Sequence, residues 1–211
     1  MVEVRIDSPM GQAETSFNVP LKCTPEEYKH FVEPAMGEAD KSNFPTALDI
    51  VTNGLNAHPA SEGLLFLKAY FGYKVADSMS NQLIALPRAI ERLPDGSLVI
   101  DGSAANQMLI QFSEIIKVLE DSDGAIDELL QVNPNSQEVS GFKNYIKAKL
   151  EKLERESTNM RTSLGNSTSI AGGFCQGCRQ TISFDTQKVV FRRASATQME
   201  VFHEACYKKP N

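Results

Sequence analysis

Apolar and polar side chains alternate in two short runs near the start of the chain, at residues 2–6 and 15–19. Ser-Pro-Met-Gly at 8–11 separates the runs and has the composition of a tight turn, so the pattern predicts an N-terminal β-hairpin. A hairpin alone is only marginally stable in water. We therefore expect it to cover a helical core as a lid; the alternative is an edge that pairs with a strand of a partner.

Helical spacing replaces this alternation from residue 24 onward, where apolar side chains recur every three or four positions. Thr24 before a proline and two acids is typical of a helix start, and Ser61 caps a long apolar stretch. Asp121-Ser122-Asp123 predicts the end of one helix and the cap of the next, and Leu93–Ser103 predicts a turn and a short extended run. The predicted helices span about 24–37, 45–58, 61–93 with a bend at Pro87, 103–120, 124–131 and 137–161.

Serine, threonine, asparagine and glycine dominate residues 157–173, and this composition predicts a flexible linker. We expect a helical domain with its N-terminal β-hairpin at 1–160, a linker at 161–173 and a small module at 174–211. The expected fold class is mainly α: an array of helical hairpins with an N-terminal β-hairpin and a small C-terminal zinc-bound α+β module.

The 211 residues include 41% hydrophobic side chains, enough to form a buried core, and carry a formal net charge of −6. Residues 170–211 hold six basic and three acidic side chains, so this tail carries +3 and the remainder −9. An acidic body repels phosphate, which argues against nucleic-acid binding by the body but leaves it open for the tail.

No apolar run approaches the ~20 residues that span a bilayer, and the N-terminus lacks the pattern of a signal peptide. We therefore expect a cytoplasmic or otherwise intracellular protein without membrane contact.

Three of the four cysteines lie in the tail, in the pattern C-x2-C, 24 residues, then H-x2-C. Two ligand pairs of this kind suit a tetrahedral Cys3His zinc site. Cys175 and Cys178 would lie on a tight turn that Gly177 permits, and His203 and Cys206 one turn apart on a short helix. Four protein ligands leave no position for a reacting water, so we expect structural zinc that supplies the folding energy of a small module. Catalytic zinc and coincidental thiols are the alternatives.

Residues 188–193 and 199–202 predict a β-hairpin between the ligand pairs, and a knuckle, a hairpin and a ligand-bearing helix form a treble-clef arrangement. This tail resembles the Cys3His zinc fingers of poly(ADP-ribose) polymerases and DNA ligases, which recognise DNA breaks, and equally the first half of a LIM domain, which mediates protein contacts. The segment between the ligand pairs is shorter than in the polymerase finger and longer than in LIM. The basic residues that would contact nucleic acid are Arg179, Lys188, Arg192 and Arg193.

Two segments of the body resemble each other: 47–49 leads to His-Pro-Ala-Ser at 58–61, and 125–127 leads to Asn-Pro-Asn-Ser at 133–136. Each reads as a helix, a proline-bearing turn and a second helix, which resembles the junction between tetratricopeptide repeats over residues 45–153. The resemblance implies stacked helix pairs with a concave surface, and an irregular helical domain is the alternative. Aromatic side chains at helical spacing are candidates for a partner groove or, alternatively, for the core: Phe66, Tyr70, Tyr73 and Phe112.

The sequence thus leads to three functional hypotheses. The first is a non-enzymatic adaptor whose helical body and zinc finger bind a macromolecular, most simply a protein, partner. The second is a nucleic-acid-associated factor whose tail docks on DNA or RNA. The third is an enzyme, for which the sequence offers no nucleophile elbow, phosphate loop or dinucleotide fingerprint. The acidic body favours the first.

Overall fold

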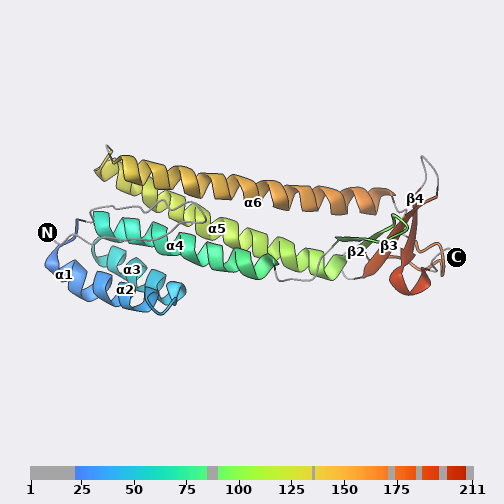
Figure 1. The fold of residues 1–211 in the computed structure, drawn as a ribbon, viewed down its shortest axis with the longest axis horizontal. Helices are drawn as coiled ribbons and strands as arrows, with labels where there is room; N and C mark the ends of the chain where they lie inside the picture. Colours follow the sequence, from blue (N-terminus) through green and yellow to red (C-terminus); the bar gives the residue numbers. More distant parts are fainter. Residues whose placement is uncertain are drawn as a thin grey trace. The chain divides into compact units, whose positions relative to one another are not determined.

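The structure, a computed structural model, describes residues 22–84, 90–134, 136–170, 174–183, 187–194 and 199–207. The predicted fold class is confirmed: the chain is mainly helical, with a small antiparallel sheet and a Cys/His cluster in its C-terminal part (Figure 1). The chain divides into two compact units, Met1–Ser80 with Ile115–Lys152 and Asn81–Glu114 with Leu153–Asn211. The hairpin predicted at 2–20 lies outside the described residues. No helix in the described ranges is long and apolar enough to cross a membrane.

The first unit opens with one helical segment made of α1 (Pro25–Glu27), a π-helical stretch (Tyr28–Val32) and α2 (Glu33–Ala39). Thr24 caps it as predicted: its Oγ1 accepts from the N–H of Glu27 at 3.2 Å, and the Glu27 carboxylate accepts from the N–H of Thr24 at 2.7 Å. Two further helices follow, α3 (Phe44–Ala57) and α4 (Glu62–Ile84).

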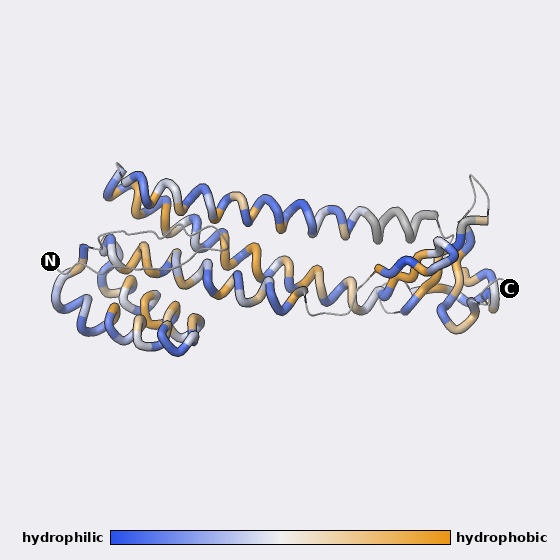
Figure 2. The backbone as a smooth tube through the Cα atoms, in the orientation of Figure 1, coloured by the Kyte–Doolittle hydropathy of each residue, from blue (hydrophilic) through white to orange (hydrophobic). Residues whose placement is uncertain are grey.

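The side chains of α4 form the centre of the first unit, because almost every one from Leu64 to Tyr73 is buried. Two longer helices, α5 (Gly102–Val132) and α6 (Gln137–Ile170), have a narrower apolar stripe. In α6 the buried positions Val139, Phe142, Ile146 and Leu153 recur at helical spacing, and most other residues of this helix up to Thr162 are hydrophilic (Figure 2). The Phe142 ring packs against Phe66 of α4 with ring centroids 5.7 Å apart.

Helix α5 runs without a break through Asp121-Ser122-Asp123, where the sequence predicted two separate helices. Ser122 is buried, and its Oγ donates a hydrogen bond to the Val118 carbonyl at 2.8 Å instead of capping a new helix. Helix α4 approaches closely here, because a Cβ on Gly72 would overlap Ser122 Oγ. Tight packing on α4 therefore favours a continuous helix over the local capping signal.

The second unit contains a four-stranded antiparallel sheet in the order β1-β2-β3-β4. Its strands are β1 (Ile90–Arg92), β2 (Leu98–Asp101), β3 (Lys188–Arg193) and β4 (Met199–His203). The β1–β2 turn includes Gly96 with φ 82°, a conformation that glycine adopts without strain. The extended run predicted at 93–103 is confirmed in β2, whereas the helical pattern predicted to reach Leu93 is wrong for 90–92, which pair with β2.

The hairpin β1–β2 and the tail share one sheet, because Ile100 of β2 pairs with Val189 of β3. The buried face is a single apolar cluster that also contains the first cysteine of the tail: Ile100, Cys175, Ile182, Val189, Phe191 and Val201. The module predicted at 174–211 therefore takes two strands from residues 90–101.

The predicted linker at 161–173 also needs correction, because α6 extends to Ile170. Adding a residue to an existing helix costs far less than starting one, so a polar sequence that follows a long amphipathic helix continues it. Residues 171–173 lie outside the described ranges.

Candidate metal centre

The first ligand pair lies on a tight turn over residues 174–181, here called the knuckle, which backbone contacts close. Phe174 and Thr181 form an antiparallel bridge, and the N–H of Cys175 donates to the Gln180 carbonyl at 2.9 Å. The N–H of Arg179 donates in turn to the Cys175 carbonyl at 2.9 Å. Arg179 has φ 65°, so the left-handed residue of this knuckle is an arginine, where the sequence had suggested Gly177.

Gly177 has a different role, which is to leave space for Cys206. A Cβ on Gly177 would lie 2.9 Å from the Cβ of Cys206 and 3.7 Å from Sγ of Cys175. Only a residue without a side chain lets the two ligand pairs approach this closely.

The second ligand pair spans the end of the sheet. His203 is the last residue of β4, and Cys206 ends a 3₁₀ turn, Glu204–Cys206. The sequence predicted both on one short helix; this is wrong, because His203 pairs with Val189 in the sheet. The H-x2-C spacing fits either arrangement, since a 3₁₀ turn also returns the chain within three residues.

The four predicted ligands converge on one point. Their ligand atoms, the sulfurs of Cys175, Cys178 and Cys206 and a ring nitrogen of His203, all lie within 4.8 Å of one another. Sγ of Cys178 is 3.3 Å from Nδ1 of His203. In a tetrahedral site with Zn–S bonds of about 2.3 Å, neighbouring sulfurs lie about 3.8 Å apart. The cluster can therefore hold a metal ion, and its donor set and spacing are consistent with zinc.

Backbone N–H groups converge on the buried thiol of Cys175. The N–H of His203 lies 3.3 Å from its Sγ. Burial raises the pKa of Cys175, but hydrogen bonds from the backbones of Cys178, His203 and Gly177 outweigh it and lower the pKa to about 6. The metal-free protein is therefore ready to present this sulfur as the thiolate that a metal requires.

Without a metal, the pKa of Cys206 shifts in the opposite direction from that of Cys175. Its hydrogen bond with Cys178, followed by burial and the contact with Cys175, raises the pKa of Cys206 to about 11. Three thiolates cannot share so small a space unless a cation neutralises them, so the metal-free cluster keeps a proton at Cys206.

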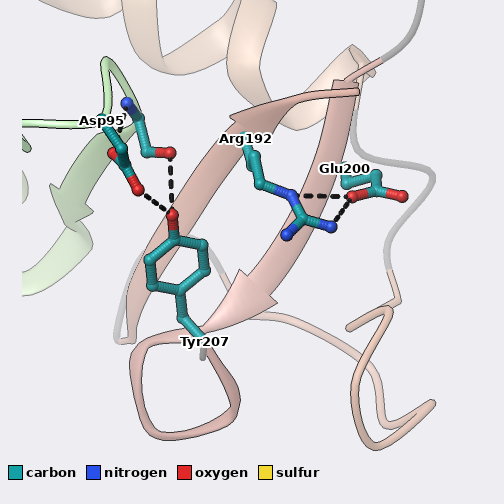
Figure 3. A network of polar contacts seen from close by, with 5 residues as sticks. Asp95, Arg192, Glu200 and Tyr207 are labelled. Atoms are coloured by element: carbon teal, nitrogen blue, oxygen red, sulfur yellow. Dashed lines mark hydrogen bonds and ion pairs between the residues drawn. The ribbon is translucent and has the colours of Figure 1, made fainter. Parts of the chain in front are cut away.

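Tyr207, next to the last ligand, ties the cluster to the β1–β2 turn (Figure 3). Its hydroxyl hydrogen-bonds with the Asp95 carboxylate and lies 3.0 Å from Ser97 Oγ. Its ring packs on Phe202 of β4 with centroids 5.8 Å apart. No local sequence pattern predicts this contact, because Tyr207 and Asp95 are 112 residues apart.

Two of the basic residues predicted to contact nucleic acid are engaged with acids. Arg192 donates through Nε and Nη2 to the Glu200 carboxylate (Figure 3). Its guanidinium also lies over the Phe202 ring, 5.2 Å from the ring centroid. Nζ of Lys188 lies 3.5 Å from Asp101. Arg179 is exposed on the knuckle, and nothing is described for the side chain of Arg193.

The four aromatic residues proposed for a partner groove are buried instead: Phe66, Tyr70, Tyr73 and Phe112 are each at most 8% exposed. Tyr73 packs edge-on against Phe142 and Tyr145 of α6. The burial of these four rings therefore favours the core alternative over the partner groove, and α6 covers Phe66 and Tyr73. Cys23, the one cysteine outside the tail, is buried.

Comparison of the chain with protein-family models, with curated proteins and with solved structures finds no match.

Proposed function

We propose that this chain is a non-enzymatic interaction protein whose C-terminal module is held together by a structural zinc ion. The observation that carries the proposal is the closed set of four ligands at Cys175, Cys178, His203 and Cys206. Four protein ligands complete a tetrahedral zinc site and leave no open position for substrate or water, unlike the three-ligand sites of zinc enzymes.

The surroundings of one pocket lined by described residues support the non-enzymatic part. This pocket, about 320 Å³, lies at the start of α1 and at the turn before α4. Its buried carboxylate, Glu27, accepts the capping hydrogen bond of Thr24 and lies 3.6 Å from His58, and its cation, Lys22, lies 3.8 Å from Glu62. Its charged groups are thus occupied with one another.

The charge pairing of the sheet favours a protein partner over nucleic acid. Lys188 and Arg192, two of the six basic residues of the tail, lie beside Asp101 and Glu200, so the charges of these two are neutralised locally. Affinity for nucleic acid rests on free cations that replace counterions at phosphates. The resemblance of the tail to the LIM type therefore describes its role better than the resemblance to the polymerase and ligase type.

The resemblance of the body to tetratricopeptide repeats contributes less to this proposal. Helices α3, α4, α5 and α6 have 14, 23, 31 and 34 residues, whereas stacked repeats need units of similar length. We therefore assign the body a scaffold role and locate recognition in the second unit.

The test uses the zinc-loaded full chain and labelled single- and double-stranded DNA and RNA of 20 nucleotides, from 50 to 200 mM salt. We expect no saturable binding. Binding that falls steeply with salt and is lost in Arg179→Ala would overturn the proposal in favour of the nucleic-acid-associated factor. A second arm compares capture of cross-linked partner proteins by wild type and by Cys206→Ser; equal capture by both would exclude the zinc module from recognition.

A further inference from the structure

Within the described residues, the imidazole of His203 has a polar contact at one of its two nitrogens. Its Nδ1 faces the cluster, 3.3 Å from Sγ of Cys178. Its other nitrogen, Nε2, is buried and has no hydrogen-bond partner within the described residues. The ring therefore enters the cluster through Nδ1 and leaves a buried polar atom unsatisfied.

This arrangement is unusual for a metal ligand. A metal-bound histidine nearly always donates the N–H of its second nitrogen to a carboxylate, a carbonyl or a water. That hydrogen bond fixes the ring and makes the ligating nitrogen more basic, and its loss typically lowers metal affinity about 10- to 100-fold. When Nδ1 holds the metal, Nε2 carries the proton, and this donor has no acceptor among the described residues.

Two of the three thiolates, those of Cys175 and Cys206, are held in place by their surroundings. Cys175 is buried, and its Sγ accepts a hydrogen bond from the N–H of His203 at 3.3 Å. Cys206 is packed against Gly177 so closely that no side chain fits between them. The bond from the histidine would therefore be weaker than the bonds from these two thiolates.

We propose that His203 coordinates the metal through Nδ1 and is the ligand that detaches first, so that zinc enters and leaves by opening of this one bond. The inference rests on the proposed zinc site and adds how that site exchanges its ion. The three thiolates keep hold of the metal while a competing ligand takes the opened position. Zinc in this module is then exchangeable, so the fraction of chains in which the module is folded depends on the concentration of free zinc.

The first measurement is a long-range ¹H–¹⁵N correlation spectrum of the histidine side chains in the zinc-loaded full chain. The chain has three histidines, and His30→Ala and His58→Ala assign the signals. We expect His203 to carry its proton on Nε2 and to show the shift of a metal-bound nitrogen at Nδ1. Metal binding through Nε2 would overturn the inference.

The second measurement is the rate at which a chromogenic chelator removes zinc from the full chain. We expect His203→Cys to slow removal about tenfold or more, because a fourth thiolate replaces the poorly supported ligand. His58→Ala, a histidine change in the first unit, should leave the rate unchanged. An unchanged rate in His203→Cys would overturn the inference while leaving the zinc site intact. Absence of zinc from the wild-type protein would instead overturn the zinc site, and this inference with it.

Discussion

Gly177 and Cys206 lie so close that a Cβ on the glycine would come within 2.9 Å of the Cβ of the cysteine. Gly177 lies between the ligands of the first pair, and Cys206 is the last ligand of the second pair. The two pairs are separated by 24 residues of the chain. The absence of one side chain at position 177 thus sets how closely the knuckle approaches the turn that carries the last ligand.

Replacing Gly177 with alanine should weaken metal binding. The added methyl group must displace Cys206, and overpacking of this kind costs about 1–3 kcal/mol. Competition with a chelator should show zinc affinity lowered by about 10- to 100-fold, with the helical content nearly unchanged. The matched control is Gly124→Ala in α5, where a Cβ meets nothing within 4 Å. That variant should bind zinc normally and gain about 0.5–1 kcal/mol from better helix propensity. Normal affinity in Gly177→Ala would show that the close approach does not shape the site.

Removing the Tyr207 hydroxyl should change the acidity of Asp95. The hydrogen bond from Tyr207, followed by the N–H of Ser97, holds the pKa of Asp95 below its ordinary value of about 3.9. Because the pKa is lower in the folded state, this contact stabilises the fold above about pH 4 and loses its effect as pH falls through the folded pKa. In Tyr207→Phe the pKa of Asp95 should rise toward the ordinary value, which carboxylate NMR can follow. An unchanged pKa would mean that Tyr207 does not contact Asp95 in solution.

Chelation of the metal should release the strands that the tail shares with residues 90–101. Backbone pairing links Leu98–Asp101 to Lys188–Phe191, and Ile100 lies in the apolar cluster with Cys175. Hydrogen exchange after chelation should show protection falling together in β2 and β3, while α4 of the first unit keeps its protection. If β2 stays protected while β3 exchanges, the hairpin at 90–101 is not part of the metal-dependent module.

The close approach of α4 and α5 in the first unit can be tested by a double-mutant cycle. A Cβ on Gly72 would overlap Ser122 Oγ but would lie 3.5 Å from Ser122 Cβ, an ordinary contact. Gly72→Ala should therefore cost about 1–3 kcal/mol in the wild-type background and much less in a Ser122→Ala background. Denaturant unfolding of the four proteins gives the coupling energy. Equal costs in both backgrounds would contradict the packing described here.

The parts of the fold that could be predicted from the sequence are those decided by nearby residues. Thr24 and Ser61 mark helix starts because a capping side chain acts within three residues. The four metal ligands were predictable because thiols and an imidazole at this spacing are rare unless they share an ion.

The parts that could not be predicted depend on distant contacts. The segment around Ser122 has the composition of a helix break. The helix continues there because Ser122 packs against Gly72 of another helix and bonds to its own helix backbone. The pairing of Ile100 with Val189 and the contact of Tyr207 with Asp95 join segments with no common local pattern. His203 was assigned to a helix because its spacing to Cys206 is the same in a 3₁₀ turn, and only the pairing of β4 distinguishes the two.

The central claim, a structural zinc ion held by the four converging ligands, is tested most directly by elemental analysis of protein purified without chelator. The account predicts about one zinc per chain in the wild type and in Cys23→Ser, whose cysteine is buried in the first unit. Cys206→Ser should lose most of the metal and the protection of β3 and β4. Wild-type protein without bound zinc, or zinc retained at full stoichiometry and affinity in Cys206→Ser, would contradict it.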